Sequence, residues 1–142
     1  MSMALARRVG YGITMVLTFS AGESAEPARV FESAYSEPLS QLAQQHADCM
    51  ASRRTQGHQG WAQRREQALQ QTGLRQASEI CAESWPEQEN STEAQLWDEM
   101  VLCWRQSPGH WSVARRRWAA YGLGLAKGRN RIWYACIIAA DP

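Results

Sequence analysis

The sequence predicts an α+β fold in which a small antiparallel sheet lies between two layers of helices, a three-layer α-β-α sandwich. Two observations predict it. Apolar residues recur at helical spacing in the first half of the chain and again near its middle. The last predicted strand, residues 131–139, is apolar on both faces, and such a strand must be covered on both sides.

The first 22 residues are predicted to be an export signal. Arg7 and Arg8 form a short basic segment, and residues 9–19 are modestly apolar. Ser20-Ala21-Gly22 then supplies the small residues that a signal peptidase requires, with cleavage after Ser24 as the alternative. Because the apolar stretch is too short to span a bilayer, we expect a secreted or periplasmic protein with no membrane span after signal removal.

The rest of the chain divides into residues 23–37, a polar arm, and residues 38–142, one folded domain. A net charge of +1 argues against a nucleic-acid partner. Seven acidic and no basic residues lie between Glu79 and Glu99, and seven basic and no acidic residues lie between Arg105 and Arg131. We interpret these runs as two solvated surfaces of opposite sign, and a face that attracts a charged ligand is the alternative.

Four cysteines fit an oxidising compartment with up to two disulfides. Three connectivities are possible, and four buried free thiols are the competing interpretation. The spacing contains no CxxC pair, so a cysteine-rich zinc site is not expected. The four residues are Cys49, Cys81, Cys103 and Cys136.

Helical spacing predicts a first helix over residues 38–54 and a second over 61–72, with Gly73 as its stop signal. A short strand is expected over 77–84, because apolar and polar residues alternate there. One face of that strand is predicted to be polar and to carry Glu79.

The third helix is predicted to open at Thr92, which forms a capping box with Gln95. Ser107-Pro108-Gly109 ends it, because proline lacks a donor and disfavours helix in the preceding residue. Two strands follow, over residues 121–126 and 131–139, joined by a hairpin turn.

Two of the three histidines are candidates for a functional site. His58 lies in a loop flanked by glycines, and His110 directly follows the Ser-Pro-Gly turn, so both can be aimed by the backbone. His46 lies near the apolar stripe of the first helix and is interpreted as a structural residue. Glu79 and Glu99 are the nearest acidic candidates, and Asp98 is the alternative to Glu99.

Two histidines with carboxylates can hold a divalent metal or form a metal-free acid/base cluster. None of the motifs HExxH, GxSxG or a phosphate-binding glycine loop is present, and no cysteine carries a catalytic signature.

The chain resembles bacterial CAP-domain proteins, the small secreted relatives of cysteine-rich secretory and plant pathogenesis-related proteins. The resemblance covers about residues 38–139 and is most specific at the Ser-Pro-Gly-His turn. The segments that carry it are His46–Ala51, Gly57–Trp61, Ser78–Ile80, Leu96–Glu99, Cys103–His110, Tyr121–Ala126 and Trp133-Tyr134.

The resemblance implies a sandwich whose central cleft holds two histidines and two acidic residues, and in several family members the histidines bind zinc. Carried over, His58 and His110 are the histidines, Glu79 is the first acid, and Glu99 or Asp98 is the second. The usual first helix of the family is missing here or reduced to the polar arm. Trp61 and Trp111 are candidates for lining a groove.

Three functions follow from these expectations. The first is a binding module of the cell envelope, whose cleft takes a divalent metal such as Zn²⁺ and a small ligand, lipid or peptide. The second is a hydrolase in which a metal-bound water or a histidine–carboxylate pair attacks the substrate. The third is a purely structural secreted module. We favour the first, because no nucleophile is marked in the sequence.

Overall fold

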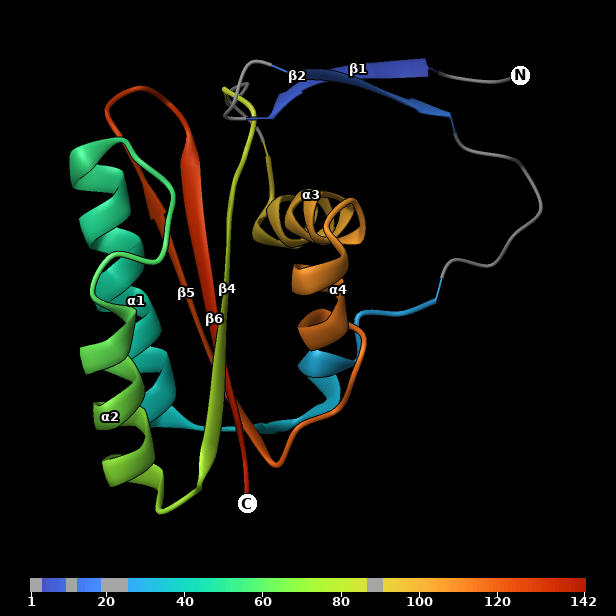
Figure 1. Ribbon diagram of the computed structural model, residues 1–142. Coiled ribbons are helices and arrows are strands. Elements are labelled where there is room, and N and C mark those ends of the chain that lie inside the picture. Colours follow the sequence, from blue (N-terminus) through green and yellow to red (C-terminus); the bar gives the residue numbers. More distant parts are fainter. Residues whose placement is uncertain (1–3, 10–12, 19–25, 87–90) are drawn as a thin grey trace.

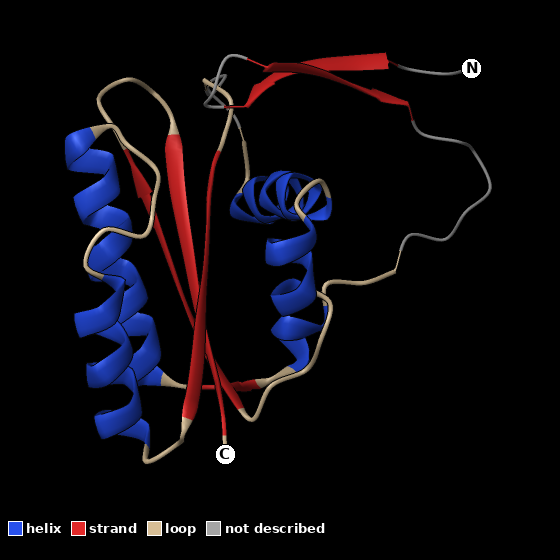
Figure 2. Ribbon diagram, in the orientation of Figure 1, coloured by secondary structure: helices blue, strands red, loops and turns tan. Residues whose placement is uncertain are grey.

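A computed structural model describes residues 4–9, 13–18, 26–86 and 91–142. Its main body is a four-stranded sheet with helices on both faces (Figure 1). Helices α1 (Glu37–Arg53) and α2 (Trp61–Thr72) cover one face, and α3 (Glu93–Arg105) and α4 (Pro108–Ala114) lie over the other (Figure 2). The predicted α+β class is confirmed.

The strands of the main sheet run in the order β3-β5-β6-β4. Their bounds are Ala34–Tyr35 for β3, Gln76–Glu83 for β4, Ala120–Lys127 for β5 and Trp133–Asp141 for β6. Both β4 and β5 pair with β6 in antiparallel fashion, whereas β3 pairs with β5 in parallel. The prediction of a purely antiparallel sheet was therefore wrong, because a two-residue strand is too short to show alternation.

The N-terminal segment contains a separate hairpin of β1 (Ala4–Val9) and β2 (Ile13–Thr18), paired in antiparallel fashion. Both possible cleavage positions of the predicted signal lie outside the described residues, so export remains a prediction. No helix in the described part of the chain combines the length and apolar character needed to cross a membrane.

Helix α1 packs directly on the backbone of β5. A Cβ atom at Gly122 would overlap the backbone of Leu39 and Ser40, and one at Gly124 would overlap the next turn of the helix. This close approach lets Ser40 Oγ accept from the backbone N–H of Leu123 at 3.1 Å. Farther along, Gln44 both accepts from and donates to the backbone of Leu125, each at 3.0 Å. The two glycines of the predicted strand therefore let side chains of α1 hydrogen-bond the backbone groups of β5 that no neighbouring strand pairs.

Each face of the sheet has its own hydrophobic core. Strand β6 contributes Tyr134, Cys136 and Ile138 to the core under α1 and α2. Its alternate residues, Ala135, Ile137 and Ala139, join the core under α3 and α4. The prediction that this strand is covered on both sides is confirmed.

The predicted helix boundaries agree closely with the structure. Ser36 caps α1, and Gly73 ends α2 in the left-handed conformation, with φ of 70°. Thr92 and Gln95 form the predicted capping box at the start of α3. These agreements follow from local chemistry, because caps and stop signals act within one turn of the chain.

Two expectations need correction. Part of the polar arm belongs to the folded body, because residues of the arm form a 3₁₀ turn, η1 (Arg29–Glu32), and Val30 is fully buried. One buried valine in a polar segment creates no period by which to detect it. The predicted polar face of β4 is not exposed, because Glu79 and Cys81 are both buried beneath α1 and α2.

Candidate functional site

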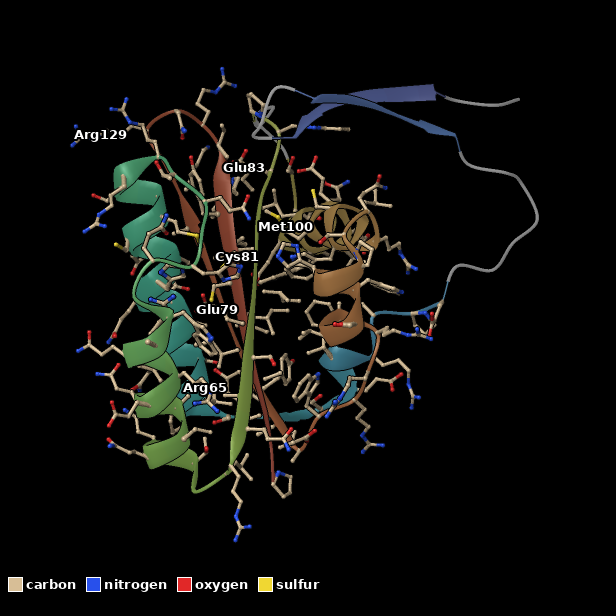
Figure 3. All side chains as sticks on the ribbon, in the orientation of Figure 1. Arg65, Glu79, Cys81, Glu83, Met100 and Arg129 are labelled. Carbon is tan, nitrogen blue, oxygen red and sulfur yellow. The ribbon has the colours of Figure 1, made fainter. Side chains whose placement is uncertain are left out.

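The centre of the candidate site is the carboxylate of Glu79, whose side chain is only 1% exposed. Its Oε1 accepts from His58 Nδ1 at 2.9 Å and from Arg64 Nη2 at 2.8 Å, and its Oε2 accepts from Arg64 Nε at 2.7 Å. Figure 3 shows Glu79 on the α1 and α2 side of β4, away from Met100 beneath α3. The pairing with Arg64 is bidentate, the strongest form of such a contact.

Arg64 also fixes the loop that carries His58. Its Nη1 donates to the carbonyl of Gln59 at 2.7 Å, so one guanidinium joins α2, the loop and β4. Arg64 was not among the residues predicted for the site. A signal was available, because Arg64 lies at helical spacing between Trp61 and the buried Ala68 and therefore faces inward.

His46 is buried beside the same carboxylate. Its Nε2 donates to the carbonyl of Gly57 at 2.7 Å and lies 3.8 Å from Glu79 Oε1. Burial alone would lower the pKa of His46, but the contacts with Cys81 and Gly57 outweigh it and raise that pKa. The prediction that His46 is a structural residue is consistent with this role in holding the loop.

Two thiols lie next to these groups. Cys81 and Cys136 are direct cross-strand partners in the β4–β6 pairing, and both are buried. Cys81 Sγ lies 3.9 Å from His58 Nδ1, and the Cys136 thiol donates to Glu79 Oε2 at 3.7 Å. Contact with Cys136 lowers the pKa of the Cys81 thiol, whereas burial raises the pKa of Cys136.

His46, Glu79 and Cys81 together form a buried group whose ligand atoms all lie within 4.8 Å of one another. These three side chains could therefore hold a metal ion. All four cysteines are free thiols in the structure, so neither of the expected disulfides is present in it.

The two predicted site histidines come together although they are on different elements. The ring centroids of His58 and His110 are 5.9 Å apart, and their planes are inclined by 53°. His58 belongs to the loop between α1 and α2, and its side chain is 43% exposed. His110 is the third residue of α4 and is half-buried.

The expected turn at His110 is instead the start of a helix. Helix α3 does end before the proline, as predicted, but Pro108 occupies the first position of α4. Proline is favoured there, because the first N–H of a helix has no intrahelical partner. The first turn of this short helix therefore positions His110.

The pKa values of the two site histidines are shifted in opposite directions. Hydrogen bonds to Cys81 and Glu79 raise the pKa of His58 from 6.5 to about 10. Burial tends to raise the pKa of Glu79, but the bonds from His58 and Arg64 outweigh it and lower that pKa to about 2. Burial and repulsion from His58 lower the pKa of His110. At neutral pH His58 is therefore a cation paired with Glu79, and His110 is neutral.

The arrangement differs from a catalytic triad. In a triad the two ring nitrogens of histidine connect the nucleophile to the acid. Here Glu79 and Cys81 both approach the same nitrogen, His58 Nδ1. The ring therefore does not relay a proton between them.

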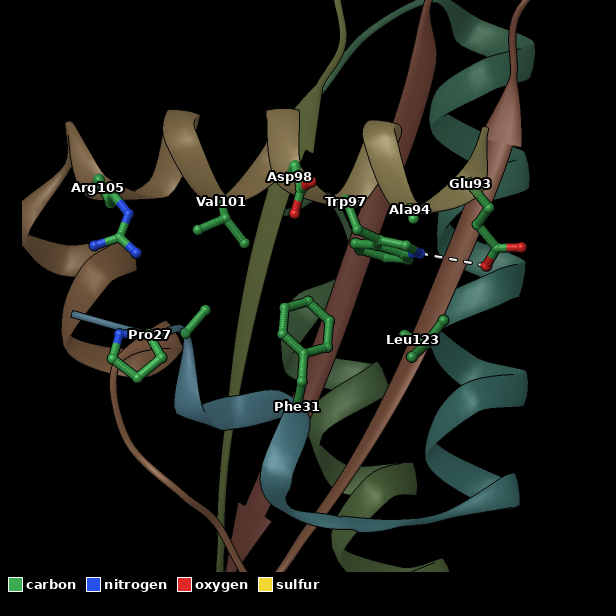
Figure 4. Close-up of a pocket in the computed structure, with 10 residues that line it drawn as sticks. Pro27, Phe31, Glu93, Ala94, Trp97, Asp98, Val101, Arg105 and Leu123 are labelled. Carbon is green, nitrogen blue, oxygen red and sulfur yellow. Dashed lines mark hydrogen bonds between the residues drawn. The ribbon is translucent and has the colours of Figure 1, made fainter. Parts of the chain in front are cut away.

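The predicted second acid does not join this cluster in the contacts that the structure gives. Glu99 Oε2 accepts from the backbone N–H of Trp85 at 3.3 Å, just beyond the end of β4. Asp98 lines a groove of about 610 Å³ between η1 and α3 (Figure 4). That groove is mostly apolar, with Phe31 and Trp97 stacked edge to face at 5.8 Å. Helix phase separates adjacent residues by about 100°, and the sequence alone does not fix it.

The groove candidates Trp61 and Trp111 are both half-buried and pack against opposite cores. The guanidinium of Arg64 lies 5.9 Å from the ring centroid of Trp61, and that of Arg105 lies 4.3 Å from Trp111. Neither tryptophan lines the groove described above. Both therefore serve here as platforms for cations.

The basic run from Arg105 to Arg131 does not gather on one surface. Arg115 pairs with Glu26 at 3.1 Å, and Arg116 pairs with Asp141 at the C-terminal end of the sheet. Lys127 and Arg129 lie at the opposite end of the sheet, at the turn between β5 and β6. Together with the end of α1, this turn lines a polar groove of about 720 Å³.

Comparison with known proteins gives a fold resemblance alone. No protein-family model matches the chain, and no curated protein matches it. A solved structure, that of an outer surface protein from Borrelia burgdorferi, matches with a TM-score of 0.58. It is 16% identical, and the match covers 77% of each chain. At this identity the two proteins share an α+β fold, and the similarity assigns no function.

Proposed function

We propose that this protein is an exported, CAP-like binding module whose histidine cleft holds one divalent metal ion, with Zn²⁺ as the favoured ion. The observation that carries the proposal is the approach of His58 to His110, with ring centroids 5.9 Å apart. Two imidazoles that share a tetrahedral zinc, with Zn–N bonds of about 2.0 Å, have centroids roughly 5–6 Å apart.

The hydrogen bonding of His58 suits a metal ligand. Its Nδ1–H donates to Glu79, which fixes the orientation of the ring and leaves Nε2 as the ligand atom. A metal would replace the proton at Nε2 while the bond to Glu79 stays in place. Glu79 is thus a positioning residue in this proposal, held in turn by Arg64.

His110 is suited to the same ion for a different reason. Its lowered pKa keeps the imidazole neutral at pH 7, and only a neutral imidazole binds a metal. Two histidine ligands leave open coordination positions, which water or a polar group of a small ligand or peptide would fill.

Two features support a location outside the cytoplasm. The N-terminal sequence has the organisation of an export signal, and the similar solved structure is named as an outer surface protein. Because the side chain of His58 is 43% exposed, an external ligand would reach it without opening a core.

The test is a Zn²⁺ titration by calorimetry on the purified protein. The wild type is expected to bind one equivalent through His58 and His110, and His58→Ala or His110→Ala is expected to remove that one equivalent. Glu79→Gln should weaken it by about 10–100-fold, as expected for a residue that positions a ligand. Asp98→Asn is the matched control and should bind like the wild type. Unchanged zinc affinity in both histidine variants would contradict the proposal.

A further inference from the structure

The two buried thiols near the site are not used by the proposed histidine cleft. Cys81 and Cys136 lie directly opposite each other on β4 and β6, with their side chains in the core under α1 and α2. The carbonyl of Cys81 accepts from Trp104 Nε1 at 3.0 Å and from Gln56 Nε2 at 3.3 Å, so it points away from β6. The cysteines therefore form a non-hydrogen-bonded pair, in which opposite side chains are closest.

Around these thiols the structure gathers nitrogen and oxygen donors. His46, Glu79 and Cys81 already have ligand atoms within 4.8 Å of one another. Cys136 Sγ adds a second sulfur, 3.7 Å from Glu79 Oε2. In a tetrahedral site with bonds of about 2.0–2.3 Å, neighbouring ligand atoms are roughly 3.3–3.8 Å apart. The distances from the Glu79 oxygens to His46 Nε2, 3.8 Å, and to Cys136 Sγ, 3.7 Å, match this spacing, and the remaining donors would move closer as they bind the ion.

We propose that Cys81, Cys136 and His46, with Glu79, form a second, inner metal site that binds a thiophilic divalent ion such as Zn²⁺ or Cd²⁺. Thiolate sulfur and imidazole nitrogen are the donors that such ions prefer. The inner site is distinct from the outer cleft, because its sulfur donors belong to the sheet and it does not use His110.

The charge of the buried cluster fits an ion of charge +2. Two thiolates and the Glu79 carboxylate carry three negative charges, which the divalent ion and the Arg64 guanidinium balance when His46 is neutral. The half-exposed His58 imidazolium adds one positive charge at the solvent side of the cluster. A buried ion is tolerated only when it is paired in this way. As the ion binds, thiol protons pass to solvent water, and Glu79 Oε2 loses the Cys136 donor and becomes available to the metal.

The site is also close to solvent. His58 lies 3.9 Å from Cys81 Sγ, and its own side chain is 43% exposed, so one side chain separates the sulfur from water. Movement of the loop that carries His58 would give an ion access without disturbing the sheet.

The test is titration of the reduced full-length protein with Co²⁺, whose thiolate charge-transfer band in the near ultraviolet reports sulfur ligation. We expect the band in the wild type, about half its intensity in Cys81→Ser or Cys136→Ser, and none in the double variant. Cys49→Ser and Cys103→Ser are matched controls that should keep the full band.

Failure of this inference and failure of the outer site are distinguishable. His110→Ala should leave the thiolate band intact even though it removes the proposed outer site. A wild-type protein that binds Co²⁺ without a thiolate band would overturn the inner site and leave the histidine cleft standing. The inference is also overturned by a band that survives in the double cysteine variant or that disappears with Cys49→Ser. Because the wild-type band decides the question first, a variant that fails to fold does not prevent the test.

Discussion

Replacing Glu79 by glutamine is the most informative perturbation of the site. The side chain keeps its shape but loses its charge, and the Arg64 guanidinium then remains with 12% exposure and no counter-charge from this residue. Removing one partner of a buried pair costs about 3–5 kcal/mol. We expect the lower end, because glutamine still accepts one hydrogen bond and the half-exposed His58 is screened by water.

The assay is thermal and urea unfolding of Glu79→Gln beside the wild type. A loss of about 3 kcal/mol lowers the Tm of a domain of this size by roughly 10–15 °C. Glu66→Gln is the matched control on the exposed face of α2, and it should change stability by no more than about 0.5 kcal/mol.

A double-mutant cycle separates the ion pair from simple loss of packing. Adding Arg64→Met to Glu79→Gln should recover part of the stability, because no unpaired cation then remains under the loop. The reasoning is refuted if Glu79→Gln stays within about 1 kcal/mol of the wild type, or if the two single costs add without coupling.

Further predictions concern the packing, pH dependence and redox chemistry of the domain. Gly122→Ala should lower the free energy of unfolding by about 1–3 kcal/mol, because the added Cβ overlaps the backbone of α1. Gly109→Ala has open space around it and should be neutral or stabilising in the same urea unfolding assay. The stability that His58 contributes should be complete below pH 6.5 and lost as the pH rises through about 10, since folding raises its pKa; a difference between wild type and His58→Gln that is constant over this range would contradict the prediction. Air oxidation of the metal-free protein should join Cys81 to Cys136, and Zn²⁺ should slow the reaction; peptide mapping that finds another pairing counts against it.

Local sequence signals predicted most of the fold. Residues such as Gly73 and Thr92 act on their own turn of the chain, so both helix boundaries could be derived without tertiary information. The short parallel strand β3 and the burial of Val30 could not be derived in this way. Both depend on contacts with elements far along the chain, which leave no period in their own segment.

The candidate site was predictable in part. The resemblance to CAP-domain proteins implied one site for His58, His110 and Glu79, and in the structure the two imidazole rings lie 5.9 Å apart while His58 is hydrogen-bonded to Glu79. That these residues form a functional site stays a prediction. The inward position of Arg64 was missed, because a charged residue on a polar helix is usually solvated. Glu99 was preferred to Asp98 although the sequence does not fix the phase of that helix, and its contact with Trp85 lies just beyond the end of β4.

The role of the cysteines could not be predicted from residue type alone. Their number suggested disulfides, but their packing beside a carboxylate and two imidazoles gives two of them, Cys81 and Cys136, a different chemical environment from the others. That environment depends on the register of β4 against β6, which the sequence did not specify.

The central claim is that His58 and His110 hold one divalent ion between them. Anomalous diffraction from crystals grown with Zn²⁺, recorded on both sides of the zinc absorption edge, tests it most directly. We expect an anomalous peak about 2 Å from a ring nitrogen of each histidine, with the Glu79 bond to His58 Nδ1 retained. Zinc-loaded crystals in which the two imidazoles have no anomalous peak between them would contradict it.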